Sequence, residues 1–104
     1  LPIYVNLSDT DLTQAVFRNA DLTNANLSNA NLLVSNFVNA NLQNVNLSNA
    51  DLRKAILRNA DLTNANLSNV VLTGADLRDA NLTGAVLDGA ILNCKNHVVC
   101  TPDT

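Results

Sequence analysis

Every fifth residue from Leu7 to Leu92 is leucine or phenylalanine, without interruption. The residue two places before each of these centres is small, and in most units it is alanine. On an α-helix, five residues advance about 500°, so these leucines would spread around the whole cylinder. On a flat strand, an odd spacing would place successive leucines on opposite faces. A continuous helix or strand therefore cannot bury this pattern.

The five-residue unit itself favours a short extended side followed by a corner. In Ala20-Asp21-Leu22, the first and third residues would face one side of an extended triplet, and the middle residue would face away. Thr23-Asn24 would then turn the chain, because Asn tolerates left-handed backbone. Repetition of this unit predicts a coil with its leucines inside, and a parallel crossover of this kind is expected to be right-handed.

A longer repeat indicates how many sides the coil has. Residues 11–30 and 51–70 are identical at 15 of 20 positions, and Phe17 and Phe37 lie 20 residues apart. Twenty residues at five per side predict four sides per coil, with equivalent side chains stacked about 4.8 Å apart. We number the sides by their first centres, which for sides one to four are Leu7, Leu12, Phe17 and Leu22.

The units A-D-L-T-N, A-N-L-S-N and A-D-L-R-D resemble those of the pentapeptide repeat family, whose pattern is A-(D/N)-L-x-x. The resemblance covers residues 5–94 and implies an all-β fold, a right-handed quadrilateral parallel β-helix (solenoid) of about 4.5 coils. Residues 1–4 are expected to form an N-terminal cap, and residues 95–104 a C-terminal cap and tail. Leucine-rich repeats are excluded, because they space their leucines unevenly within about 20–29 residues.

Charge and hydropathy exclude several classes of partner. The formal net charge is −3, so the chain is not expected to bind nucleic acid or an anionic membrane surface. No run of about 18 apolar residues exists that could insert into a bilayer. The chain begins at Leu1 instead of methionine, as expected of a mature form whose targeting segment has been removed.

Both ends of the predicted solenoid need capping, because an open β-helix exposes unpaired strand edges. We expect a monomer or weak end-to-end association. Pro2 is expected to blunt the N-terminal edge, while Val98 and Val99 cover the C-terminal layer. His97, five residues after Leu92, would occupy the next centre. Burial under this tail is expected for three apolar residues that face outward, Val71, Val86 and Ile91.

The only two cysteines, Cys94 and Cys100, lie in this tail. A disulfide between them would hold the cap down and would imply an oxidising compartment. One alternative is two free thiols; another is a C-x2-H-x2-C set of metal ligands with His97, which lacks a fourth member. We expect the disulfide and no cofactor. Together with the family resemblance, this disulfide predicts an extracytoplasmic location, because family members in cyanobacteria and chloroplasts often lie in the periplasm or the thylakoid lumen. The cytoplasm is the alternative.

One outward cluster departs from the polar surface. Leu33, Val34 and Val38 are expected near the corner between sides two and three. The register places four cations around them, Arg18 on one side and Arg53, Lys54 and Arg58 on the other. An apolar spot rimmed by cations is a candidate docking patch for an acidic partner. The alternative is that β-branched residues simply favour strand positions and the arginine stems cover them.

Catalysis is the least supported function, because repetition gives the Ser, Thr and Asp residues equal environments and the single histidine lies in the tail. We predict a non-enzymatic structural or protein-binding module with a protein partner of unknown identity. The family resemblance implies an alternative, a DNA-mimic inhibitor of a type II topoisomerase, but the mixed charge and short rod argue against it. Ice binding by the Ser, Thr and Asn ladders is a third hypothesis, weakened where Gln43 interrupts the threonines.

Overall fold

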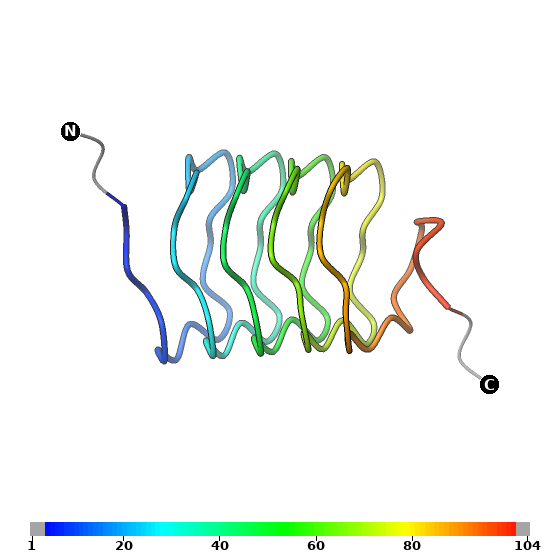
Figure 1. Ribbon diagram of the computed structural model, residues 1–104, viewed down its shortest axis with the longest axis horizontal. Helices are drawn as coiled ribbons and strands as arrows, with labels where there is room; N and C mark the ends of the chain where they lie inside the picture. Colours follow the sequence, from blue (N-terminus) through cyan, green and yellow to red (C-terminus); the bar gives the residue numbers. More distant parts are fainter. Residues whose placement is uncertain (1–3, 102–104) are drawn as a thin grey trace.

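The computed structural model describes residues 4–101 as a stack of coils along one axis, shown in Figure 1. The N-terminal and C-terminal ends of this range lie at opposite ends of the stack. Residues 4–101 contain no helix and no continuous strand; their regular elements are single-residue parallel bridges between neighbouring coils. The molecule is therefore built from short extended triplets, as the five-residue unit predicts.

Until the chain reaches Lys95, each bridge joins residues 20 positions apart, and the bridges form four columns, one on each side. Side one joins Asn6, Asn26, Asn46, Asn66 and Val86; side two joins Asp11, Asn31, Asp51, Val71 and Ile91. Side three joins Val16, Asn36, Ile56 and Asp76; side four joins Asp21, Asn41, Asp61 and Asn81. The twenty-residue register and the side assignments agree with the sequence prediction.

Hydrogen bonds of one unit show why the chain turns every five residues. The Leu27 N–H donates to the carbonyl of Asn46 in the next coil at 2.7 Å, and the Asn29 N–H donates to Ser48 at 2.9 Å. The Ala30 N–H donates back to the Leu27 carbonyl at 3.2 Å and closes a turn. Asn29, the third residue of this turn, has a φ of 60°. Positive φ at this place is typical of a type II turn and favours Asn or Gly.

The outward residue before each centre commonly supports the same turn through its side chain. Asn26 Oδ1 accepts hydrogen bonds from the Ser28 N–H at 3.0 Å and from the Ser28 hydroxyl at 2.7 Å. The same arrangement recurs where Asp precedes the centre, as between Asp21 and the Thr23 hydroxyl at 2.6 Å. The polar ladders are thus largely satisfied within the protein, which explains the abundance of Asn without invoking a ligand.

The core is a narrow column of leucine centres and small residues, and it is buried through the middle of the stack. Phe37 is fully buried, and its ring stacks on that of Phe17 with centroids 5.0 Å apart and planes 11° apart. Ser35, which takes the place of alanine, is buried too, and its hydroxyl donates to the Leu32 carbonyl at 2.7 Å. The interior therefore leaves little scope for a ligand.

The regular register ends at the C-terminal tail with a shift of one residue. Asp76 is bridged to Lys95, 19 positions further on, because only Cys94 separates Asn93 from Lys95, whereas the preceding coil has two residues between Thr73 and Asp76. The prediction that His97 occupies the next centre of the beat was therefore wrong, because the register does not continue unshifted past Lys95. Sequence periodicity cannot detect this shift, because the repeat has already stopped at Leu92.

The tail covers less of the last coil than predicted. Val99 packs partly against the core, but Val98 is 96% exposed, so the prediction that Val98 covers the last layer was wrong. Burial of Val86 and Ile91 was also wrong, because they are 46% and 51% exposed. Their side chains are at outward bridge positions, which a tail lying over the end of the column does not reach. Val71 is half-buried, and the predicted role of Pro2 lies outside the described residues.

Candidate functional site

The residues of the predicted docking patch lie in two corner columns, one at each end of side three, and not at a single corner. The Asn19 N–H donates to Val38 and the Asn39 N–H donates to Arg58, so Val38 lies between Arg18 and Arg58 in one column. In the neighbouring column, the Val34 N–H donates to the Arg53 carbonyl at 3.0 Å. Leu33 and Val38 are half-buried, whereas Val34 is exposed.

Val34 combines two unfavourable properties, of which the sequence analysis recognised the exposure but not the backbone strain. It has a φ of 61°, and the other non-glycine residues with positive φ in the described range are Asn, Asp, Gln and Lys. A β-branched residue in the left-handed region is a genuine outlier, because its Cβ substituents clash with the backbone. Val34 is also 41% exposed, so burial compensates only in part. The recurrence of Asn and Gly at this corner place was the signal that could have revealed the strain.

The four cations of the patch differ in how far they are neutralised. Arg53 forms an ion pair with Asp51 at 2.6 Å, and Arg58 forms one with Asp76. Arg18 and Lys54 have no carboxylate within ion-pair distance among residues 4–101. The free positive charge of the patch therefore resides on Arg18 and Lys54, on either side of the apolar residues.

Side three has apolar residues at two of its four outward bridge positions. Val16 and Ile56 take the place that Asn or Asp occupies in most units, so the N–H groups of Arg18 and Arg58 lack a side-chain acceptor. Val16 is 72% exposed. Side three thus presents apolar side chains, guanidinium groups and free backbone donors on one flat face, next to the docking patch.

Carboxylates outside the patch are held in their ionised form. Hydrogen bonds from the hydroxyl and N–H of the following threonine lower the pKa of Asp11, Asp21 and Asp61. The Arg53 side chain lowers the pKa of Asp51 in the same way. A carboxylate with a lowered pKa is ionised at neutral pH and is a poor general acid. The arrangement therefore offers charge and hydrogen-bond acceptors, but no acid–base pair.

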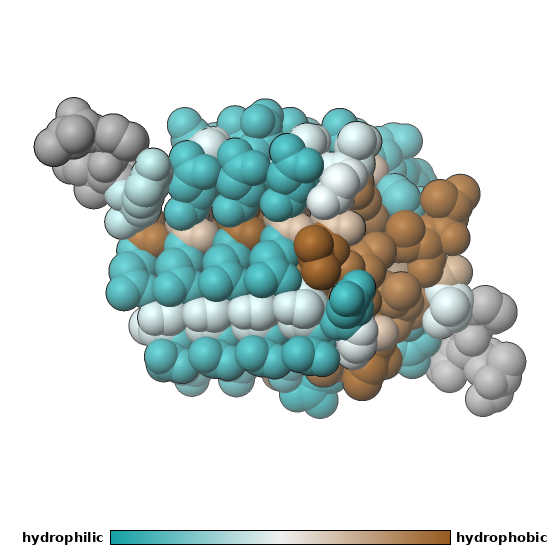
Figure 2. All heavy atoms as spheres, viewed as in Figure 1, coloured by the Kyte–Doolittle hydropathy of each residue, from teal (hydrophilic) through white to brown (hydrophobic). Residues whose placement is uncertain are grey.

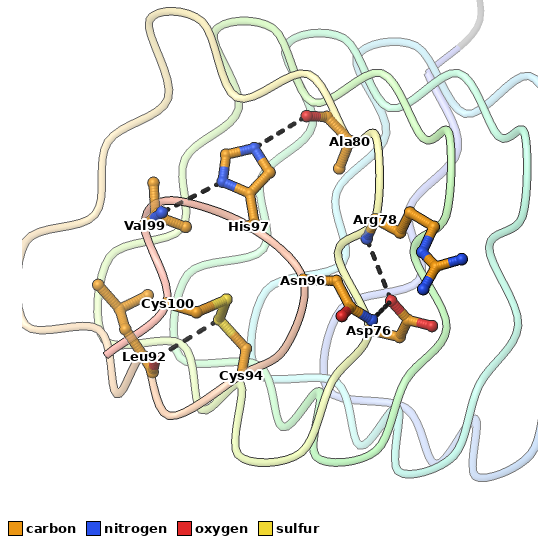
Figure 3. Close-up of a disulfide and its surroundings, with 9 residues drawn as sticks. All are labelled: Asp76, Arg78, Ala80, Leu92, Cys94, Asn96, His97, Val99 and Cys100. Carbon is orange, nitrogen blue, oxygen red and sulfur yellow. Dashed lines mark hydrogen bonds between the residues drawn. A yellow bond between two sulfur atoms is a disulfide. The ribbon is translucent and has the colours of Figure 1, made fainter. Parts of the chain in front are cut away.

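The C-terminal tail, residues 95–101, is fixed by a disulfide and by side-chain hydrogen bonds, as Figure 3 shows. Cys94 and Cys100 are joined at an S–S distance of 2.03 Å. The Val99 N–H donates to Nδ1 of His97 at 3.2 Å, so Nε2 carries the proton and donates to the Ala80 carbonyl at 3.0 Å. His97 is therefore a capping residue, with both ring nitrogens engaged by the backbone.

Asp76 is the second anchor of this tail. Its Oδ1 accepts hydrogen bonds from the Asn96 amide at 2.8 Å and from the Arg78 N–H at 3.1 Å, while its Oδ2 pairs with Arg58. The hydrogen bond from the Asn96 amide, with a smaller contribution from Arg58, lowers the pKa of Asp76 to about 2. The same carboxylate thus links the docking patch to the tail.

The described residues show no alternative site of the usual kinds. Over residues 4–101 there is no pocket and no group of three metal-ligating side chains. Within the same range no helix is long and apolar enough to cross a membrane. Figure 2 shows the face that the molecule offers instead: regular rows of polar residues and, toward the C-terminal end, a region of apolar residues.

Five-residue units, a twenty-residue parallel register and an interior of leucine and alanine define a class of protein, the four-sided β-solenoid. A model of pentapeptide repeats matches in eight copies, over residues 3–32, 35–74 and 55–93. The chain belongs to the pentapeptide repeat family. Members of this family form right-handed quadrilateral β-helices and generally serve as structural or binding modules. The comparison with curated proteins finds no match.

Solved structures of this family are similar to the chain along most of its length. HetL, involved in heterocyst differentiation regulation in the cyanobacterium Nostoc sp. strain PCC 7120, is 39% identical with a TM-score of 0.76, over 80% of this chain and 38% of HetL. A protein from the Arabidopsis thaliana thylakoid lumen is 29% identical with a TM-score of 0.83, over 94% and 69%. QnrB1, a plasmid-mediated fluoroquinolone resistance protein, is 25% identical with a TM-score of 0.83, over 88% and 48%. The chain thus spans less than half the length of HetL and of QnrB1.

Proposed function

We propose that the protein is a non-enzymatic binding module that docks an acidic protein partner at the patch formed by Leu33, Val34, Val38, Arg18, Arg53, Lys54 and Arg58. The observation that carries this proposal is Val34, which is strained and exposed at the centre of the patch. Backbone strain of this kind costs about 1–3 kcal/mol and often occurs at ligand clamps. Asn, which the chain uses at most equivalent corners, would avoid both the strain and the exposed apolar surface.

The electrostatics of the patch support an acidic partner. Arg18 and Lys54 carry charges that no carboxylate of the described residues neutralises, although the chain as a whole has a net charge of −3. Charge complementarity at an interface chiefly increases the association rate and the specificity of binding. Binding through this patch should therefore weaken as salt screens Arg18 and Lys54.

A regulatory binding role is consistent with the neighbours, since HetL is involved in heterocyst differentiation regulation. The alternative, a DNA-mimic inhibitor of a type II topoisomerase, finds less support in the surface. Even the most acidic column, on side four, alternates Asp21 and Asp61 with Asn41 and Asn81. A mimic of DNA relies on a strong and continuous negative field. A gyrase supercoiling assay without inhibition at micromolar protein would eliminate this alternative.

An extracytoplasmic location is part of the same proposal. It is supported by the Cys94–Cys100 disulfide and by the similarity to a protein of the Arabidopsis thylakoid lumen. Titration of thiols in the unreduced protein taken from its native compartment tests it. Two free thiols per chain would remove the argument.

The docking patch is tested by recovery of partners from the native compartment. The variant Leu33→Asp/Val34→Asp places two negative charges in the patch and should abolish recovery of an acidic partner. The matched control, Ser28→Asp/Asn29→Asp, makes the same change at the equivalent places on side one. Equal recovery by wild type and both variants would reject the patch. Loss with both variants would point to a general effect of negative charge instead.

A further inference from the structure

Side three carries two arginines whose backbone N–H groups are free and whose side chains are exposed. In most units the N–H after a centre donates to the outward Asn or Asp two residues before it, as the Val38 N–H does at 3.0 Å. Val16 stands in that place before Arg18, so the Arg18 N–H has no acceptor among residues 4–101. Ile56 leaves the Arg58 N–H free in the same way. Each arginine therefore offers an oxyanion two kinds of donor, a backbone N–H and a guanidinium.

Other free N–H groups of this origin do not belong to basic residues. They follow outward Val71, Val86 and Ile91, and they belong to Thr73, Asp88 and Asn93. Within residues 4–101, a free N–H of this kind thus coincides with a guanidinium only at Arg18 and Arg58. We call these two residues the arginine donor sites.

The arginine donor sites lie two coils apart in one column. Backbone hydrogen bonds place Arg18, Val38 and Arg58 at the same corner of three successive coils. At about 4.8 Å per coil, the two free N–H groups are about 9.6 Å apart. The Val38 N–H between them is already bonded to Asn36. The column therefore offers two oxyanion sites at this separation, with an apolar side chain between them.

We propose that side three binds an extended acidic segment of the partner protein, which runs along the solenoid axis and places a carboxylate on each arginine donor site. This inference rests on the proposed function and names the part of the partner that the patch receives. In the polyproline II conformation, three residues make one turn and advance about 9.3 Å, so acidic residues at every third position face one way at nearly the required separation. A β-strand fits less well, because residues three apart face opposite sides and residues two apart are only about 6.6 Å apart.

The surroundings favour carboxylates of a protein over the phosphates of a nucleic acid. Val16 is 72% exposed, and Val38 and Ile56 are half-buried, so much of the face beside the arginines is apolar. Asp76 and Asp79 lie on the same side, and the chain has a net charge of −3, so a closely spaced row of phosphates would be repelled. A protein segment with well-separated carboxylates and apolar side chains between them matches both properties of the face.

The two arginine donor sites are unequal. The Arg58 Nε donates to Asp76, which neutralises part of its charge and leaves the two terminal nitrogens without a partner among residues 4–101. Arg18 has no carboxylate within ion-pair distance in the same range. Arg18→Gln should therefore weaken binding of the segment more than Arg58→Gln does, and the reverse order would contradict the assignment of charges.

The first test uses a synthetic peptide of repeated Asp-Pro-Pro units, because proline favours the polyproline II conformation. The control peptide has the same composition, with its aspartates alternately two and four residues apart. The regular peptide should bind about tenfold more tightly, roughly the contribution of one hydrogen bond to a charged group. Equal affinity for both peptides would overturn the spacing. Tighter binding of a single-stranded DNA oligonucleotide, or of a helical peptide with acidic residues seven apart, would overturn the choice of an extended protein segment.

Substitutions at Val16 test the free N–H directly. Val16→Asn introduces the residue that accepts this N–H in other units, so it occupies the Arg18 donor without changing any charge. Val16→Ala removes a similar apolar contact but leaves the N–H free. Val86→Asn makes the same substitution on side one and is the matched control. Val16→Asn should weaken binding of the regular peptide about tenfold and the other two much less. Equal weakening by Val16→Asn and Val16→Ala would contradict the role of the N–H.

Nuclear magnetic resonance gives a readout that a merely structural role would not change. The amide protons of Arg18 and Arg58 should shift downfield as the regular peptide binds, because each gains a charged acceptor. The Arg78 N–H already donates to Asp76 at 3.1 Å (Figure 3) and should shift little. Binding of the peptide without shifts at Arg18 and Arg58 would refute the arginine donor sites.

Recovery of the partner from the native compartment separates this inference from the proposed function. Leu33→Asp/Val34→Asp tests the docking patch, and Val16→Asn/Ile56→Asn tests the arginine donor sites. Both variants should lose the partner, while Val86→Asn retains it. Loss with the first variant and full recovery with the second would leave the patch in place and refute the seating of the segment on side three. Full recovery with both variants would reject the patch and this inference together.

Discussion

Val34 is a residue at which substitution should raise stability and lower binding at once. A left-handed conformation costs a residue other than Gly or Asn about 1–2 kcal/mol, and Val34 has a φ of 61°. Val34→Asn removes most of this strain. It also removes two methyl groups, each worth about 0.8 kcal/mol when fully buried and here roughly half covered, so the loss is about 0.8 kcal/mol. The net expectation is a gain of about 0.5 kcal/mol.

The assay is thermal and urea unfolding of Val34→Asn beside wild type, with binding of the acidic partner measured in parallel. For a chain of this size the gain corresponds to roughly 2–4 °C in Tm. Lys54→Asn is the matched control, because Lys54 occupies the same corner in the next coil with a φ of 60° and no β-branch. Its free energy of unfolding should rise by about 1 kcal/mol, because Lys54 carries the same left-handed cost and its replacement removes only an exposed side chain.

Two outcomes are distinguished by this comparison. If Val34 is a binding residue, Val34→Asn is more stable than wild type and binds its partner less tightly. If Val34 instead contributes mainly packing, Val34→Asn loses about 1 kcal/mol or more, and the reasoning from strain is refuted.

Three further predictions concern the tail and the core. Cys100→Ser removes the disulfide, whose closure of the loop stabilises the tail by about 2 kcal/mol. Amide exchange of Val99 should therefore accelerate roughly 30-fold, while that of the middle coils is unchanged. Uniform acceleration along the chain would contradict the view that each coil is stabilised only by its neighbours. The lowered pKa of Asp76, about 2, means that its stabilisation of the tail is fully present above about pH 4 and is lost as pH falls through 2. This loss of stability should appear as faster amide exchange of the tail at low pH, after correction for the intrinsic exchange rate. Asp76→Asn should remove the pH dependence of the corrected exchange rate. A double-mutant cycle of Phe17→Leu and Phe37→Leu, measured by chemical denaturation, should give a coupling free energy of about 0.5–1.5 kcal/mol between the two rings. If the two losses of unfolding free energy simply add, the ring stacking does not contribute to stability.

Periodicity alone predicted the architecture because every unit repeats the same solution. A leucine at each fifth residue must face inward, and a period of twenty leaves no other number of sides. The recurring Asn at corners such as Asn29 and Asn49 predicted left-handed backbone, which the φ values of 60° and 62° agree with. These inferences needed no tertiary information, since each coil contacts only its neighbours.

The path of the tail could not be predicted in the same way, and the strain of Val34 was overlooked. The one-residue shift at Cys94 depends on how a single disulfide-bonded loop closes, and nothing repeats there that would reveal it. The exposure of Val86 and Ile91 depends on the path of that loop. Val34 was singled out for its hydrophobicity alone, although the Asn and Gly at equivalent corners already indicated the left-handed backbone that strains it.

In a repetitive fold, residues that break the repeat carry most of the functional information, because the repeat itself is explained by folding. Outward Asn and Asp satisfy the N–H two residues on, so their replacement by Val16 or Ile56 leaves a free donor. Val34 adds strain to exposure, and the last coil leaves its amides open. Each departure costs stability that a consensus residue would restore. The strain of Val34 and the free donors that follow Val16 and Ile56 lie on and beside side three, and further free donors follow Val71, Val86 and Ile91 toward the C-terminal end. Asn and Ser on side one, in contrast, form an unbroken, self-satisfied ladder from Asn6 to Ser68. A purely structural spacer would have no reason to place a strained and exposed residue beside two unpaired cations, and this combination is why we place binding beside side three.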